Sequence, residues 1–273
     1  MKQFMQKYWL IALIIPLLLI SCSNSDDENK EEAESFKAEA PWVPARAKKI
    51  KEMDFEYDAV IPYTDASGKK VWDKANTERR KGKGYVFLDE KYKVVYVVDW
   101  PGASTNAADG ANTPFYFNFD TQDVVAEADA LARTKTWHVK HFDIYNAFIL
   151  TDATTENGQP GLGKLRIIRS PFDQLDEAPA EPMIRTAASV EFEDRESVDG
   201  WGRYRLSDHI LHPYKDRTFI FQLRDGRYVK YQLANLYRSN PDNVIDKYEY
   251  EAPFFNFRYF IQQMPNDRNV KTR

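Results

Sequence analysis

Three successive segments near the C-terminus alternate hydrophobic and polar residues, and this period of two restricts the fold more than any other feature. Residues 219–223 and 228–236 both alternate, and the Asp225-Gly226 pair between them is a strong signal for a β-hairpin turn. A third alternating segment follows at residues 255–261, after a connection that contains a proline. The sequence therefore predicts an antiparallel sheet at the C-terminus. One face of its third strand would consist of Phe255, Phe257, Tyr259 and Ile261.

The composition extends this prediction to most of the chain. Aromatic residues make up 14% of it, with 16 Tyr and 17 Phe, and ring side chains favour strands over helices. Residues 36–273 are uniform in composition, so we expect one all-β domain of antiparallel twisted sheets or a sandwich, with long loops. The net charge of −4 argues against a nucleic-acid partner, which would require a basic face.

The first 21 residues are typical of a lipoprotein signal peptide. Lys2 and Lys7 precede a hydrophobic run at residues 8–20. A helix of about 13 residues spans about 20 Å, which is too short for a bilayer core. The run ends in Leu-Ile-Ser-Cys, the pattern in which the cysteine is lipidated and becomes the mature N-terminus.

Cys22 is the only cysteine of the chain, which excludes a disulfide framework. Its acyl chains would anchor the protein to a membrane lipid without embedding it. Residues 22–35 then combine the lipidated cysteine with an acidic segment that has too few hydrophobic residues to fold, so we expect a flexible tether.

Between the tether and the C-terminal sheet the elements are less regular. Residues 45–51 suggest a short helix and residues 55–63 a strand. The basic segment 74–84 is expected to be a solvated loop, because its Arg-Arg-Lys-Gly-Lys-Gly run lacks a phosphate-binding pattern. Residues 85–88 and 94–100 suggest two strands joined by a turn, and residues 101–113 a long loop.

Several segments, in order, resemble the HmuY family of haem-binding lipoproteins, which sit on the surface of Bacteroidetes-type bacteria. The resemblance covers residues 115–262, a little over half of the chain, although His138 stands where that family usually has Asp. The segments that carry it are the aromatic strand and turn at 115–125, the Trp-x-Val segment at 137–143, the Phe-Asp and Ala-Pro element at 170–179, the stretches 201–204 and 209–213, and the final hairpin at 219–261.

The resemblance implies a non-enzymatic protein that captures haem at the cell surface for iron acquisition. Such proteins hold the iron through two histidines or two methionines. The acidic residues 26–28 also resemble the signal that directs lipoproteins to the outer face of the outer membrane. The partners implied are outer-membrane lipid through Cys22, host haemoproteins as the haem source, and a TonB-dependent haem receptor.

The four histidines supply candidate ligands for haem iron, and they form two His-x-x-His pairs. Residues three apart in a strand point to opposite faces, so one pair cannot chelate one ion unless the strand breaks. One donor from each pair suits the two axial positions of haem better than a tetrahedral zinc site. We therefore expect His141 and His209 to be the ligands, with His138, His212 and Tyr145 as weaker candidates.

Each histidine also has a structural interpretation. If residues 137–145 form one strand, His141 could be a hydrogen-bonded core residue, with His138 facing solvent. His209 could simply close a turn. If histidines do hold the iron, haem binding should weaken as the pH falls through about 6.5, because a protonated imidazole cannot bind iron.

Two other classes of protein compete with haem capture. Ser207, Asp208 and His209 contain the residue types of a catalytic triad, but sequence neighbours cannot converge as a triad does, so we expect no enzyme. A surface lipoprotein of the same fold could instead bind a glycan or a protein on exposed aromatic rings.

Overall fold

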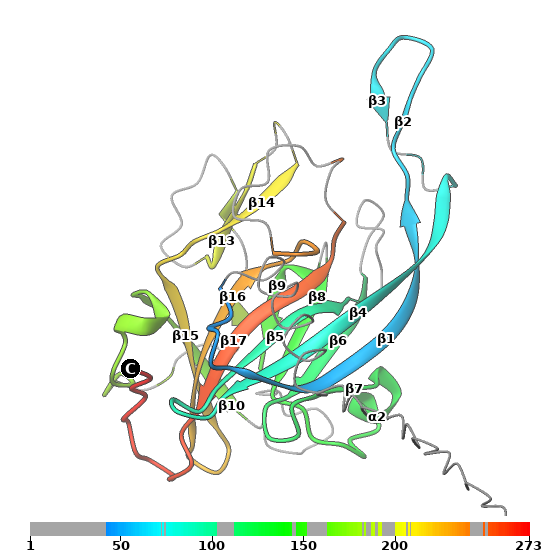
Figure 1. Cartoon of the computed structure of the whole chain (residues 1–273). Coiled ribbons are helices and arrows are strands. Elements are labelled where there is room, and N and C mark those ends of the chain that lie inside the picture. Colours follow the sequence, from blue (N-terminus) through cyan, green and yellow to red (C-terminus); the bar gives the residue numbers. More distant parts are fainter. Residues whose placement is uncertain are drawn as a thin grey trace, which may run out of the picture. The chain divides into compact units, whose positions relative to one another are not determined.

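Alternating residues build the strands, and the strands pair into sheets in the computed structural model of the chain (Figure 1). The structure describes residues 42–71, 73, 75–102, 112–143, 146–151, 163–181, 183, 187–188, 191–192, 200–205, 207, 209–240, 248 and 251–273. The chain divides into two units, Met1–Ala38 and Glu39–Arg273, and the described residues belong to the second. The predicted signal peptide, Cys22, the acidic tether and Tyr145 lie outside the described residues.

The largest sheet has seven antiparallel strands and confirms the all-β class. Their order across the sheet is β1 (Lys48–Val60), β4 (Thr77–Asp89), β5 (Val94–Pro101), β17 (Phe254–Ile261), β16 (Tyr228–Asn235), β15 (Arg217–Leu223) and β10 (Gly163–Arg169).

A second antiparallel sheet contains β11 (Ala187–Ala188), β9 (Phe148–Leu150), β8 (Val139–Asp143), β6 (Asn112–Asn118) and β7 (Asp123–Val125). Smaller sheets consist of β12 (Glu191–Phe192), β13 (Gly202–Arg205) and β14 (Ile210–Pro213), and of β2 (Tyr63–Thr64) and β3 (Lys70–Val71). The helical elements among the described residues are α2 (Glu127–Leu131) and a 3-10 turn, η4 (Phe172–Gln174). No helix in the described part of the chain has the length and apolar character needed to cross a membrane.

The predicted C-terminal sheet is present. β15 and β16 form the expected hairpin, and Gly226 has the positive φ of +86° that its tight turn requires. β16 pairs in turn with β17. The predicted face of β17 packs into the main hydrophobic core through Phe255, Phe257 and Tyr259, with Ile261 at the margin.

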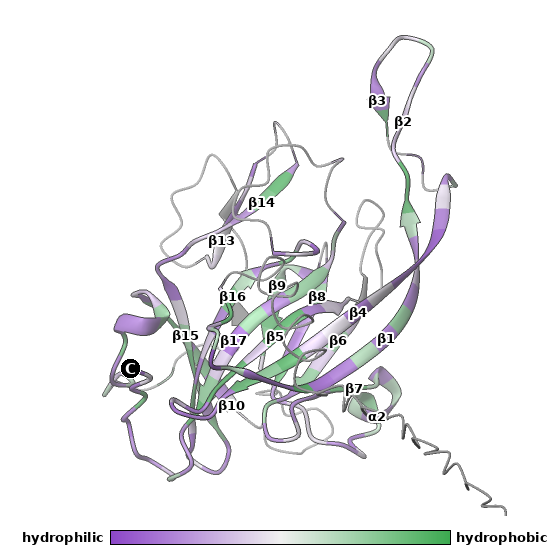
Figure 2. Cartoon of the chain, in the orientation of Figure 1, coloured by the Kyte–Doolittle hydropathy of each residue, from purple (hydrophilic) through white to green (hydrophobic). Residues whose placement is uncertain are grey.

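One aromatic core joins the two large sheets. Phe115 of β6 stacks on Phe255 of β17 with ring centroids 4.0 Å apart, and Phe117 meets Phe257 edge-on at 5.1 Å. Each buried ring removes about 150–250 Å² from water, so such pairs account for much of the stability of the sheet packing. Figure 2 shows the hydrophobic colour concentrated in the central strands, with more hydrophilic positions along β1 and β4.

Two predictions for the N-terminal half are wrong. Residues 48–51, expected in a helix, begin β1, and residues 77–84, expected in a solvated loop, belong to β4. The cause is long-range pairing, because β1 and β4 are antiparallel partners over nearly their whole length. Tertiary contacts of this kind override local helix propensity and polar composition.

Opposite charges face one another across this strand pair. The register places Asp54 opposite Lys83 and Glu56 opposite Lys81. Arg79 donates to Glu56 and to Asp58 at 3.2 Å. Cross-strand pairs of opposite charge stabilise a sheet by a few tenths of a kcal/mol to about 1 kcal/mol each. The basic residues of β4 therefore form one side of a ladder of oppositely charged pairs between β1 and β4.

Candidate functional site

His209 lies in the short connection between β13 and β14, and its side chain is exposed. Its backbone has a φ of +59°, an uncommon value for a residue other than glycine. The backbone N–H of His209 donates to the carbonyl oxygen of Arg205 at 2.8 Å, which holds this tight turn. Such left-handed positions occur often at binding and active sites.

The imidazole of His209 is oriented by a tyrosine. The hydroxyl oxygen of Tyr204 lies 2.7 Å from Nδ1 of His209. When Nδ1 carries the proton and donates it to this oxygen, Nε2 keeps the lone pair that a metal requires. No described residue forms a hydrogen bond or ion pair with Nε2 of His209. The turn therefore presents an oriented donor to its surroundings.

His141, the other first candidate, is a core residue. Its side chain is fully buried on β8, and Nε2 lies 3.0 Å from the hydroxyl of Tyr231. The ring packs against Phe255, with centroids 4.7 Å apart. Burial lowers the pKa of His141 to about 3, only partly opposed by the backbone of Asn146. Binding of haem iron by His141 would therefore require the aromatic core to open.

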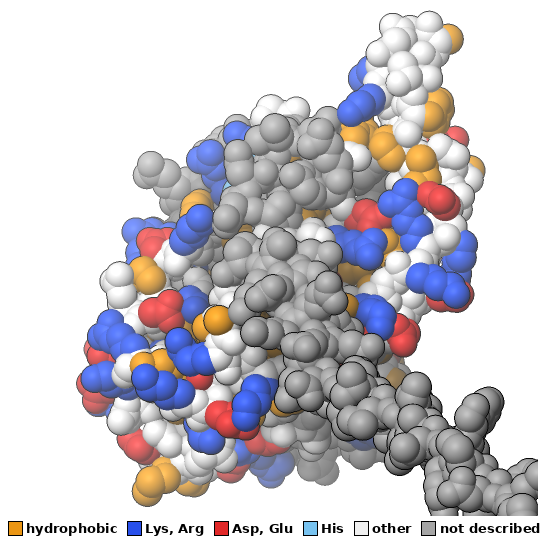
Figure 3. Space-filling view, in the orientation of Figure 1, with side chains coloured by type: hydrophobic (Ala, Val, Ile, Leu, Met, Phe, Trp, Pro, Cys, Tyr) orange, Lys and Arg blue, Asp and Glu red, His pale blue; other side chains and the backbone are white. Residues whose placement is uncertain are grey.

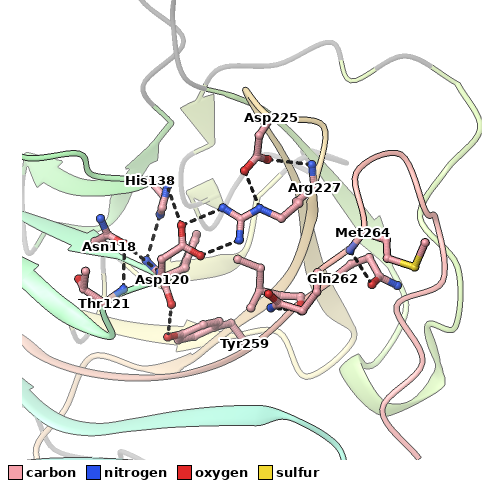
Figure 4. A network of polar contacts seen from close by, with 12 residues as sticks. Asn118, Asp120, Thr121, His138, Asp225, Arg227, Tyr259, Gln262 and Met264 are labelled. Carbon is pink, nitrogen blue, oxygen red and sulfur yellow. Dashed lines mark hydrogen bonds and ion pairs between the residues drawn. The ribbon is translucent and has the colours of Figure 1, made fainter.

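His138 is also buried, at 7% exposure, so the expectation that it faces solvent is wrong. Its ring stacks on Phe119, and the Phe119 backbone N–H donates to Nδ1 of His138 at 3.0 Å. In the neutral ring the proton is then on Nε2, which lies 3.9 Å from Asp120. Figure 4 shows His138 beside the ion pair in which Arg227 binds Asp120. Burial lowers the pKa of His138, although Asp120 opposes this.

His212 is half-buried on β14, where it pairs with Arg203 of β13. The structure thus puts His138 and His141 in different packing environments and His209 on an exposed turn. The side-chain hydrogen bonds of His138, His141 and His209 go to Phe119, Tyr231 and Tyr204. The described residues contain no group of three or more His, Cys, Asp or Glu side chains that could hold a metal ion.

A second feature was missed by the sequence analysis. A cleft of about 700 Å³ runs along β4 and the residues that follow β16. Its lining combines Arg80, Gly82, Asp99, Arg238, Ser239 and Glu251. Basic residues occur at every second position in residues 79–83, and acidic residues occur at every second position in residues 52–58. This match could have indicated from the sequence that the two segments pair and that residues 79–83 form a strand beside the cleft.

The fold defines the class of the molecule as an all-β protein of packed antiparallel sheets. In comparisons with known proteins, no protein-family model matches the chain and no curated protein matches it. The likeness to the HmuY family therefore remains a prediction that depends on the quoted sequence segments.

Proposed function

We propose that this chain is a lipid-anchored surface protein that captures haem without turnover, with His209 as an axial ligand of the iron. The observation that carries this proposal is the exposed imidazole of His209, held at Nδ1 by Tyr204 at 2.7 Å. Ligand histidines are commonly oriented through their second ring nitrogen in this way. Tyr204 is a positioning residue, because it acts through His209.

His209 fits haem better than His141 does. An exposed donor can approach a porphyrin face, whereas the Nε2 atom of His141 is engaged by Tyr231 inside the core. Bound haem would supply an iron centre that accepts a nitrogen lone pair. His209 would hold the iron, and Tyr204 would orient His209 for that contact.

The anchor is part of the same proposal. Cys22 would be acylated and inserted in outer-membrane lipid, and residues 23–35 would hold the folded part away from the surface. In this arrangement the protein takes haem from host haemoproteins and passes it to a TonB-dependent receptor. Nucleic acid is not a partner, and no reaction is catalysed.

The test is an absorbance titration of haemin into the full-length chain in detergent micelles. We expect a saturable one-to-one Soret change for the wild type, about tenfold or more weaker binding for His209→Ala, and a smaller loss for Tyr204→Phe. Circular dichroism checks that both variants are folded. A wild type without a saturable Soret change, or a His209→Ala variant that binds equally well, would refute the proposal.

The alternative is a surface lipoprotein of the same fold that binds a glycan or a protein instead of haem. The cleft along β4 favours this alternative, because its lining combines charged groups with the aromatic ring of Tyr85. If haemin does not bind, we would infer that the chain binds a glycan or a protein instead.

A further inference from the structure

The cleft along β4 contains a network centred on Glu251. Tyr57 donates to Glu251 at 2.5 Å, and Arg238 donates to Tyr57 at 2.6 Å and to Glu251 at 3.1 Å. Arg80 reaches the other carboxylate oxygen of Glu251 at 2.5 Å. Burial alone would raise the pKa of Glu251, but these hydrogen bonds lower it below its ordinary value. The carboxylate is thus ionised and already saturated by protein donors.

A second carboxylate at the cleft is used in the same way. Asp99 accepts the backbone N–H of Ser239 at 2.7 Å, which ties β5 to the residues that follow β16. Both residues have positive φ values, 50° for Asp99 and 63° for Ser239. Strained positions of this kind cluster at ligand sites. Asp99 therefore fixes the cleft wall, and its negative charge helps to keep Arg238 protonated.

Arg238 provides unused hydrogen-bond donors in the cleft. Arg238 uses Nη1 for Tyr57 and Glu251, whereas its Nε and Nη2 atoms have no partner among the described residues. Its guanidinium is held over the ring of Phe254, with Cζ 5.9 Å from the ring centroid, so its orientation is restricted. A fixed guanidinium with free donors is suited to a carboxylate.

Gly82 has no side chain, so the β4 wall of the cleft leaves space beside the Arg238 guanidinium. A Cβ atom at Gly82 would lie 2.6 Å from the ring of Phe55 and 3.5 Å from Nη2 of Arg238. At the outer margin, the exposed Asp54 has only a 3.5 Å ion pair with Lys83, so its oxygens can accept hydroxyl groups. Figure 3 shows Lys and Arg interspersed with Asp and Glu along the side where β1 and β4 lie.

We propose that this cleft is a binding site for a carboxylated sugar, with the ligand carboxylate on Arg238 and its hydroxyls on polar groups of the rim. The volume of about 700 Å³ lies within the range of small-ligand sites, about 300–1,000 Å³. Tyr85 adds an aromatic ring to the lining, which suits the apolar face of a sugar. This site is separate in its residues from His209 and goes beyond the haem proposal.

The test follows the glycine amide signals of the full-length chain, labelled with nitrogen-15 glycine in detergent micelles, during titration with D-glucuronate. We expect the Gly82 and Gly84 signals to shift saturably, while Gly226 in the β15–β16 turn stays in place. D-glucose and acetate, which each lack one half of the proposed ligand, should act much more weakly.

Variants assign the effect to the cleft. Arg238→Gln should weaken glucuronate binding about tenfold or more, because a charge-assisted contact is lost. Arg80 and Arg79 are neighbours on β4, but only Arg80 lines the cleft, and Arg79 is paired with Glu56 and Asp58. Arg80→Gln should therefore weaken binding, and the matched Arg79→Gln variant should leave it within about twofold.

Three results would overturn the proposal: no glucuronate-dependent shift, an equal response to glucose or acetate, or an Arg79→Gln loss as large as that of Arg238→Gln. An unchanged Gly226 signal shows that a variant is folded. Haemin titrations distinguish a failure of this proposal from a failure of the haem proposal. Arg238→Gln should leave haemin binding intact, and His209→Ala should leave glucuronate binding intact.

Discussion

At the scale of single residues, the environment of each histidine matters more than its position in a motif. His141 and His209 belong to two His-x-x-His pairs, His141 as the second member and His209 as the first, yet His141 is fully buried and His209 is exposed. The sequence identified both as candidate donors. It could not separate them, because the partner of His141, Tyr231, is 90 residues away along the chain.

The buried His141 should make stability depend on pH. Its folded pKa of about 3 lies below the unfolded value of about 6.5, so the unfolded state binds more protons between these values. The free energy of unfolding should therefore fall as the pH drops below about 6.5, by about 2 kcal/mol from this residue at pH 5.

Urea unfolding at pH 7 and pH 5 measures this effect. His141→Phe should lose the His141 contribution of about 2 kcal/mol, while the buried His138 keeps its own contribution. The variant should also lose some stability at pH 7, because the Tyr231 hydroxyl loses a partner. His209→Ala serves as the exposed control. Equal pH dependence in the wild type and in His141→Phe would contradict the assignment.

Lys230 is a second buried polar residue, fully enclosed on β16. Its Nζ donates to the carbonyls of Phe172 and Leu175 at 3.1 and 3.0 Å and to Thr272 at 2.7 Å. These bonds attach the last residues of the chain and the η4 turn to the large sheet. Burial lowers the pKa of Lys230 to about 7, although Asp173 opposes this.

The lowered pKa predicts that Lys230 disfavours folding at neutral pH relative to alkaline pH. Between about 7 and 10.4 the unfolded state binds more protons, so stability rises with pH. Relative to Lys230→Met, the wild type should gain about 3 kcal/mol of unfolding free energy between pH 7 and pH 9.5. Urea titrations at both values test this, and a constant difference would contradict it.

At the scale of elements, the C-terminal strands could be predicted, as could residues 55–60 of β1 and 85–88 of β4, but the remaining parts of this N-terminal strand pair could not. β15, β16 and β17 carry regular hydrophobic alternation, which is a local signal. One face of β1 carries the acidic residues that meet Arg79, Lys81 and Lys83 of β4, whereas its other face buries Tyr57 and Ala59. The first half of β4 has few hydrophobic residues, so its pairing with β1 depends on matched charges between distant segments. The cleft was missed for the same reason, since Arg80 and Glu251 meet only after folding.

Exchange of charges tests the ladder between β1 and β4. Glu56 and Lys81 are register partners, so Glu56→Lys should destabilise the sheet by about 1 kcal/mol through like-charge repulsion. Adding Lys81→Glu should recover part of this loss. A double-mutant cycle measured by urea unfolding would show no coupling energy if the ladder contributed nothing.

At the scale of the whole molecule, the two large sheets pack around an aromatic core, and the proposed ligand groups lie outside that core. Two antiparallel sheets share one core, in which His141 is packed, whereas His209 lies on a turn outside it. The all-β class followed from the sequence. The sequence could not show that His141 is a core residue and His209 an exposed one, because this difference arises only when the two sheets pack together.

The central claim is that the exposed histidine, and not the buried one, binds haem. The most direct measurement is a parallel haemin titration of the wild type, His209→Ala and His141→Phe, each checked for folding by circular dichroism. Our account predicts near wild-type affinity for His141→Phe and about tenfold or more weaker binding for His209→Ala. The opposite order, with binding lost only in His141→Phe, would contradict it.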